Sequence, residues 1–93
     1  MKSKPTVYIK PGCPWCNEAL DFFAAAGIEV EVKDVLRDPE AMERMIEISQ
    51  QTLTPTFEFG DFIVPDFSTD EFKAALAKRP DIQKALGMTA RAH

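Results

Sequence analysis

Residues 5–16 read Pro-Thr-Val-Tyr-Ile-Lys-Pro-Gly-Cys-Pro-Trp-Cys, and this stretch decides the fold. The β-branched and aromatic residues 6–9 predict a strand, and Lys10-Pro11-Gly12 predicts a turn. From residue 14 to residue 26, buried positions recur at steps of four and three, which predicts a helix that Gly27 ends. The stretch therefore predicts a strand, a turn and a helix, with both cysteines at the start of the helix.

The next segments predict a second strand and a second helix. Residues 28–33 alternate apolar and charged side chains, which is typical of a strand with one face in water and favours the edge of a sheet. Asp38 before Pro39 is an N-cap followed by a first-turn proline, and the apolar spacing after it predicts a helix to about Gln50.

The last third of the chain predicts a hairpin and more helix. Residues 56–59 and 62–64 flank the two residues Gly60-Asp61, the spacing of a tight antiparallel turn. Ser68 and Glu71 match a capping box for a helix over about 69–78. After Pro80, residues 81–86 predict one or two turns that Gly87 ends, with Ile82, Ala85 and Leu86 facing inward and a tail behind them. This order of elements favours an α/β fold with a mixed sheet and a right-handed parallel crossover first.

Length and composition describe a small globular protein. The 93 residues predict a single domain over 1–93, with its core at about 5–78 and a short helix and tail at 80–93. A net charge of -4 disfavours nucleic acid as a partner. No apolar run approaches the length of a membrane span, and no export signal is visible, so we expect a cytoplasmic protein. We also expect it to be a monomer.

The two cysteines, Cys13 and Cys16, carry the chemistry. Cys13 falls at the predicted N-cap, where unpaired backbone amides and the helix dipole stabilise an anionic sulfur, and Lys10 adds a cation. Cys16 lies one turn further on the apolar side, where burial keeps a thiol protonated. One thiol is therefore expected to attack and the other to resolve. Because the only histidine is the final residue, His93, cysteine-protease chemistry is disfavoured.

Two structural roles for the cysteine pair are weaker alternatives. Tetrahedral zinc needs two further ligands, and the sequence has no second cysteine pair, so no metal site is predicted. A structural disulfide across two intervening residues would remove little entropy from the unfolded chain. Redox work is the favoured interpretation.

Residues 7–16, together with Thr54-Pro55 at the start of a strand, resemble a dithiol glutaredoxin over residues 5 to about 78. The resemblance implies a thioredoxin fold, a four-stranded mixed sheet with helices on both faces. It implies that Cys13 attacks protein disulfides or glutathionylated thiols, and that glutathione is the cosubstrate with no permanently bound cofactor. Proteins carrying those disulfides or glutathionylated thiols would be the other partners.

The resemblance also implies a glutathione site and a cis peptide bond before Pro55. Taken singly, each of these residues also has a plain structural explanation, such as a solvated lysine, a helix-end amide or a helix cap. Trp15 is expected to be a half-exposed aromatic beside the reactive sulfur. The residues implied to contact glutathione are Lys10, Trp15, Gln51, Thr54, Pro55, Ser68 and Thr69.

One segment departs from the family pattern. Where glutaredoxins usually carry two glycines and then two acids, residues 64–69 read Val-Pro-Asp-Phe-Ser-Thr. This removes room for close backbone approach and places the charge of Asp66 near an expected carboxylate. A redoxin reduced by a thioredoxin-reductase-type flavoprotein therefore stays open as an alternative.

Two further alternatives lie outside catalysis. Cys13 from two chains and two glutathiones could hold a two-iron two-sulfur cluster. Pro14 argues against this carrier role, because its ring stiffens the loop and, in the family, proline at this position goes with thiol exchange. A redox-sensing interaction domain without turnover cannot be separated from the others by sequence.

Overall fold

The computed structural model describes residues 4–86 and contains four strands and four helices in that range. The predicted stop at Gly87, the tail after it and His93 lie outside the described residues. In chain order the elements are β1 (Thr6–Ile9), α1 (Pro14–Ala26), β2 (Glu31–Asp34), α2 (Pro39–Ser49), β3 (Thr56–Phe59), β4 (Phe62–Val64), α3 (Thr69–Ala77) and α4 (Pro80–Ala85).

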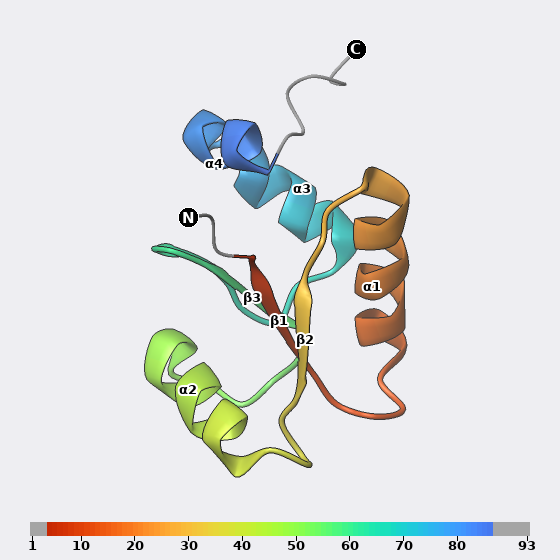
Figure 1. Ribbon diagram of the computed structural model, residues 1–93, viewed down its shortest axis with the longest axis vertical. Coiled ribbons are helices and arrows are strands. Elements are labelled where there is room, and N and C mark those ends of the chain that lie inside the picture. Colours follow the sequence, from red (N-terminus) through yellow and green to blue (C-terminus); the bar gives the residue numbers. More distant parts are fainter. Residues whose placement is uncertain (1–3, 87–93) are drawn as a thin grey trace.

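The strands form one mixed sheet in the order β2-β1-β3-β4. β1 pairs in parallel with β2 and antiparallel with β3, and β3 pairs antiparallel with β4. α1 and α3 lie on one side of this sheet and α2 on the other (Figure 1). The expected four-stranded mixed sheet with helices on both faces is therefore confirmed, as is the position of β2 at a sheet edge.

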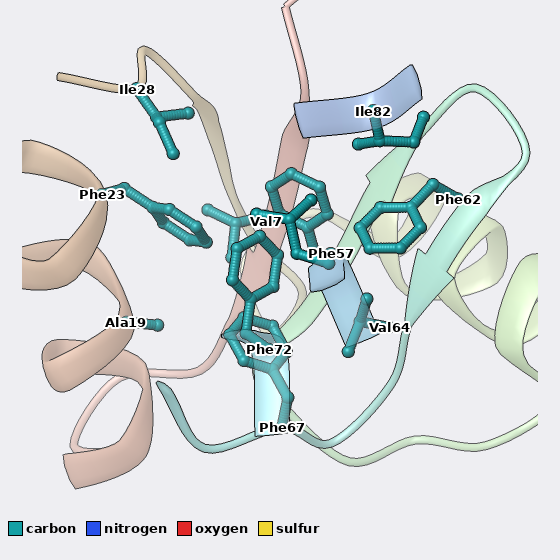
Figure 2. Close-up of a cluster of buried hydrophobic side chains, with 11 residues drawn as sticks. Val7, Ala19, Phe23, Ile28, Phe57, Phe62, Val64, Phe67, Phe72 and Ile82 are labelled. Carbon is teal, nitrogen blue, oxygen red and sulfur yellow. The ribbon is translucent and has the colours of Figure 1, made fainter. Parts of the chain in front are cut away.

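The larger hydrophobic core lies between the sheet and the helices α1, α3 and α4. Its aromatic rings pack edge to face: the Phe57 and Phe72 centroids lie 4.8 Å apart and those of Phe23 and Phe72 lie 5.2 Å apart. Ile82 of α4 is also buried here, so the packed part of the chain continues beyond residue 78. Figure 2 shows this cluster, which comprises Val7, Ala19, Phe23, Ile28, Phe57, Phe62, Val64, Phe67, Phe72, Leu76 and Ile82.

A smaller core covers the opposite face of the sheet. Because side chains alternate along a strand, Val7 faces the larger core and Tyr8 faces α2, where it packs with Val35, Ala41 and Met45. Beside this core, the Tyr8 hydroxyl donates a hydrogen bond to Oε1 of Glu58. Burial and the Glu58 carboxylate raise the pKa of Tyr8 well above its ordinary value.

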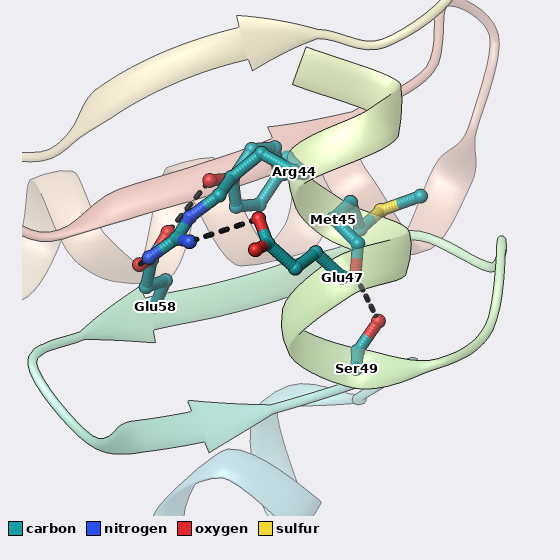
Figure 3. Close-up of polar contacts among 6 residues, drawn as sticks. Arg44, Met45, Glu47, Ser49 and Glu58 are labelled. Carbon is teal, nitrogen blue, oxygen red and sulfur yellow. Dashed lines mark hydrogen bonds and ion pairs between the residues drawn. The ribbon is translucent and has the colours of Figure 1, made fainter. Parts of the chain in front are cut away.

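An arginine attaches α2 to the sheet at the same place. Arg44 donates to Oε2 of Glu58 at 2.7 Å and to Oε1 of Glu47 at 3.1 Å (Figure 3). Glu58 thus accepts from both Tyr8 and Arg44, which joins β1, β3 and α2 through one carboxylate.

Most local predictions are confirmed and the second strand is the main difference. α1 spans the predicted residues and ends at Gly27, which has a φ of 74°. The predicted strand at 28–33 begins only at Glu31, because the amide of Ile28 still bonds to the carbonyl of Phe23 and its side chain enters the core. Similarly, Ala85 is exposed rather than turned inward, whereas Ile82 is buried as expected.

Candidate functional site

The dithiol lies where the chain leaves β1 and enters α1. Gly12 adopts a φ of 75°, a left-handed turn conformation that glycine takes without steric cost, and Pro14 occupies the first turn of the helix. Cys13 is the N-cap, with an extended backbone, and its sulfur accepts a hydrogen bond from the backbone N–H of Cys16 at 3.2 Å. The predicted position of Cys13 at the helix N-terminus is confirmed.

The two thiols differ in exposure. Both are free cysteines; Cys13 is half-buried and the side chain of Cys16 is only 1% exposed. The sulfur of Cys13 is therefore the more accessible of the two.

A loop from the other half of the chain completes the surroundings of Cys13. The peptide bond between Thr54 and Pro55 is cis, as the family resemblance implied. The Thr54 hydroxyl lies 3.8 Å from the Cys13 sulfur, within hydrogen-bonding range for sulfur, and the Thr54 carbonyl oxygen lies 4.0 Å from it. Thr54 can thus donate to the sulfur when it is charged and accept from it when it is protonated.

These contacts separate the acidities of the two thiols. Partial burial opposes ionisation of Cys13, but hydrogen bonds from Cys16, the Thr54 hydroxyl and the Trp15 amide outweigh it and lower the pKa of Cys13. The pKa of Cys16 is raised, mainly because the thiol is buried and also because it forms a hydrogen bond with Cys13. The geometry accordingly favours a thiolate at Cys13 and a protonated thiol at Cys16.

Two predicted binding residues, Trp15 and Ser68, line a small cavity beside α1, and a third, Thr69, directly follows Ser68. This cavity has a volume of about 300 Å³ and is lined by Trp15, Asp66, Phe67, Ser68 and Glu71. Trp15 is 55% exposed, which confirms the expectation of a half-exposed aromatic. Ser68 is the N-cap of α3 and Thr69 its first residue. The structure therefore brings Trp15 together with the start of α3.

Lys10 and Gln51 instead contact the loop that precedes Pro55. The Lys10 ammonium donates to the backbone carbonyl of Thr52 at 2.8 Å. The Gln51 amide bonds to Ser49, Leu53 and Thr56 within the chain. Neither side chain lines the cavity beside Trp15.

Sequence reasoning missed two features of the site. Thr54 was expected only as a glutathione contact, whereas its side-chain hydroxyl also faces Cys13, which lies 41 residues away in sequence. Glu71 was expected only as part of the capping box, whereas this carboxylate also lines the cavity. The capping-box motif marked the position of Glu71, but no local signal points Thr54 at the sulfur.

A larger cavity of about 1190 Å³ lies elsewhere, between the start of β1, the loop after α1 and helix α4. Neither cysteine lines it, so it is separate from the dithiol. Across residues 4–86, no three His, Cys, Asp or Glu side chains are grouped so that they could hold a metal ion. In that same part of the chain, no helix has the length and apolar character needed to cross a membrane.

Two known proteins are similar to this chain in sequence. The "Gene 56 protein" of Mycobacterium phage D29 is 29% identical over 76 residues, covering 82% of this chain and 73% of its own. The protein of the same name from Mycobacterium phage L5 is 32% identical over 76 residues. The match covers 82% of this chain and 64% of the length of the phage protein.

Solved structures of other proteins are similar to this chain in fold. The thioredoxin-like protein BC3987 superposes with a TM-score of 0.70 at 26% identity, over 77% of this chain and 99% of its own. The glutaredoxin from Brucella melitensis superposes with a TM-score of 0.65 at 26% identity, over 95% of this chain and 92% of its own. These likenesses confirm the thioredoxin fold. The glutaredoxin family model matches residues 6–64, well over half of the chain, and this protein therefore belongs to the glutaredoxin family of thiol redox proteins.

Proposed function

We propose that this protein is a glutathione-dependent thiol-disulfide oxidoreductase with Cys13 as its nucleophile. The observation that carries the proposal is the position of the Cys13 sulfur at the N-terminus of α1. This sulfur accepts a hydrogen bond from the backbone N–H of Cys16 and faces the Thr54 hydroxyl. A half-exposed thiol with a lowered pKa is suited to attack a disulfide and also to leave one.

Reduction of a glutathionylated protein would use one cysteine. The Cys13 thiolate attacks the glutathione sulfur of the mixed disulfide, the protein thiolate leaves and takes a proton from water, and Cys13 becomes bonded to glutathione. A second glutathione thiolate attacks that glutathione sulfur, which releases oxidised glutathione and restores Cys13.

Reduction of a protein disulfide would use both cysteines. Cys13 attacks one substrate sulfur and the other leaves as a thiolate. Cys16 then loses its proton and attacks the Cys13 sulfur, which forms the Cys13–Cys16 disulfide and frees the reduced substrate. Two glutathiones reduce this disulfide again. The buried, protonated state of Cys16 keeps it from attacking the substrate in place of Cys13.

Binding of glutathione would use residues along the loop before Pro55 and residues at the cavity beside Trp15. The Lys10 ammonium has three N–H groups and uses one on Thr52, so two are available for a carboxylate. Thr54 offers its backbone as an added-strand partner, and Pro55 holds the loop end beside it. Trp15, Ser68 and Thr69 would contact the opposite end of the tripeptide.

The test is reduction of a glutathionylated substrate with glutathione, glutathione reductase and NADPH. We expect turnover by the wild type, none by Cys13→Ser, and retained turnover by Cys16→Ser, which loses only the reduction of protein disulfides. Absence of wild-type turnover, or full turnover by Cys13→Ser, would reject the proposal.

A flavoprotein reductase as electron donor is the second candidate function. The lining of the cavity beside Trp15 includes the two acidic residues Asp66 and Glu71, and residues 64–67 lack the glycines that the family usually has. Both features weaken the fit to the carboxylate of a tripeptide. Glutathione and a thioredoxin-reductase-type flavoprotein should be compared as donors side by side, and faster reduction by the flavoprotein would favour this candidate.

The iron-sulfur carrier is tested separately. A preparation that stays colourless after anaerobic reconstitution with iron, sulfide and glutathione contradicts the carrier, and a coloured dimer supports it. The catalytic proposal predicts a colourless monomer and places the protein in a reducing compartment such as the cytoplasm.

A further inference from the structure

The side-chain amide of Gln51 is fully occupied inside the protein. Its Nε2 donates to Oγ of Ser49 at 2.9 Å and to Oγ1 of Thr56 at 3.1 Å, and its Oε1 accepts from the backbone N–H of Leu53 at 2.6 Å. Since the Leu53 N–H can only donate, the amide has one consistent orientation. Both of its N–H groups are therefore used, and none is left for a carboxylate of a ligand.

These three bonds span the loop that carries Thr54. Ser49 is the last residue of α2 and Thr56 is the first residue of β3, so the amide connects the two elements that border the loop. Thr56 is 0% exposed, and its hydroxyl donates to the carbonyl of Leu53 at 2.9 Å. Leu53 is thus held at its N–H by Gln51 and at its carbonyl by Thr56.

The loop has few other attachments within the described residues. Residues 51–55 belong to no helix or strand, so side chains supply the bonds that a regular element would supply with its backbone. Lys10 donates to the carbonyl of Thr52, the Ser49 hydroxyl to the carbonyl of Gln51, and the Phe67 amide to the carbonyl of Pro55. On the N-terminal side of Thr54, Leu53 is held by the Gln51 amide and the Thr56 hydroxyl. The position of Thr54, one residue after Leu53, therefore depends on the Gln51 amide.

We propose that Gln51 is a positioning residue, whose amide holds the loop so that the Thr54 hydroxyl faces the Cys13 sulfur. The inference rests on the proposed role of Cys13 as the nucleophile. The Thr54 hydroxyl is 3.8 Å from that sulfur, a distance at which a small displacement removes the interaction. Gln51 then acts on the reaction through Thr54 and does not touch the substrate.

The readout is the pKa of the Cys13 thiol, obtained from the pH dependence of its alkylation. The groups that bear on it are Cys16 and the Trp15 amide at the start of α1, and Thr54 with its neutral hydroxyl from the facing loop. Gln51→Met keeps the length of the side chain and removes all three amide bonds. We expect Cys13 in this variant to react roughly three- to tenfold more slowly below its pKa, as for a weakened hydrogen bond to a charged group.

A matched control separates positioning from general stability. Gln83 donates through Nε2 to the carbonyl of Leu76 at 2.9 Å, where it holds the junction of α3 and α4. Gln83→Met removes a structural amide bond of the same kind at a site with no contact to the dithiol. It should lower the free energy of unfolding without changing the rate at which Cys13 is alkylated.

A double-mutant cycle identifies the route. Thr54→Val removes the hydroxyl that faces Cys13, and we expect Gln51→Met to add little to its effect on the alkylation rate. If Gln51→Met does not fold, Thr56→Val serves instead, because it removes one acceptor of the Gln51 amide and the bond to the Leu53 carbonyl. It should slow alkylation in the same direction.

An alkylation profile of Cys13 in the Gln51 or Thr56 variant that equals that of the wild type would overturn the inference. If the Gln51 variant also shows a raised KM for glutathione, Gln51 is a ligand contact instead. Since alkylation needs no glutathione, a protein that fails the glutathione assay and still shows the shift would reject only the proposed function.

Discussion

The hydroxyl of Tyr8 in β1 donates a hydrogen bond of 2.6 Å to Oε1 of Glu58 in β3, on the sheet face that α2 covers. Arg44 of α2 donates to the other oxygen of the same carboxylate at 2.7 Å. The phenol therefore helps to hold a carboxylate and an arginine that attach α2 to the central strands.

Tyr8→Phe should lower the free energy of unfolding by about 1.5–3 kcal/mol, the range for a hydrogen bond to a charged group. Chemical denaturation of both proteins measures the difference. Equal stability would mean that the bond contributes nothing beyond what water supplies.

The ionisation of Tyr8 makes a second prediction. Burial and Glu58 raise its pKa above the ordinary value of 10.0, so its contribution to stability is complete below about pH 10 and declines as the pH rises further. Because Tyr8 is the only tyrosine, the ultraviolet absorbance of phenolate reports on it alone. We expect this absorbance to appear only when the protein unfolds, and a normal titration in the folded protein would contradict the account.

Ile82 should be the residue that makes α4 part of the fold. It is 7% exposed and packs into the larger core, so Ile82→Ala is expected to cost about 2–5 kcal/mol of unfolding free energy. Lys84→Ala in the same helix is the control, because Lys84 is exposed. Similar effects of the two substitutions on the denaturation midpoint would show that α4 is only loosely attached.

Ser68 is predicted to have a structural role that is separable from binding. Its hydroxyl accepts a hydrogen bond from the backbone N–H of Glu71 at 3.2 Å. The backbone N–H of Ser68 donates a hydrogen bond to the Glu71 carboxylate at 2.9 Å. Ser68→Ala should cost about 1 kcal/mol of unfolding free energy, and Ser68→Asn should restore most of it because asparagine is also a good N-cap. A stability loss that asparagine fails to restore would argue against the cap.

Local patterns predicted the parts of the site that depend on neighbouring residues. The N-cap position of Cys13, the stop at Gly27 and the capping box at Ser68 each follow from a few consecutive side chains, and each is present. The late start of β2 was missed because the αL turn at Gly27 continues the bonding of α1 to Ile28.

The remaining features depend on contacts between distant segments. The Thr54 hydroxyl reaches Cys13 only because the sheet brings the end of β1 next to the start of β3. The three bonds of Gln51 arise from a loop conformation that no pattern in residues 50–55 specifies. The meeting of Trp15 with Asp66 and Glu71 likewise requires α1 and α3 to pack side by side.

The most direct test of the account is the pKa of the Cys13 thiol in the reduced wild-type protein, followed by alkylation or by thiolate absorbance against pH. Hydrogen bonds from Cys16, Thr54 and Trp15 predict a value clearly below that of a free cysteine, about 8.5, with Cys16 unreactive over the same range. The contradicting result is a Cys13 thiol that titrates like free cysteine, or a Cys16 that reacts first.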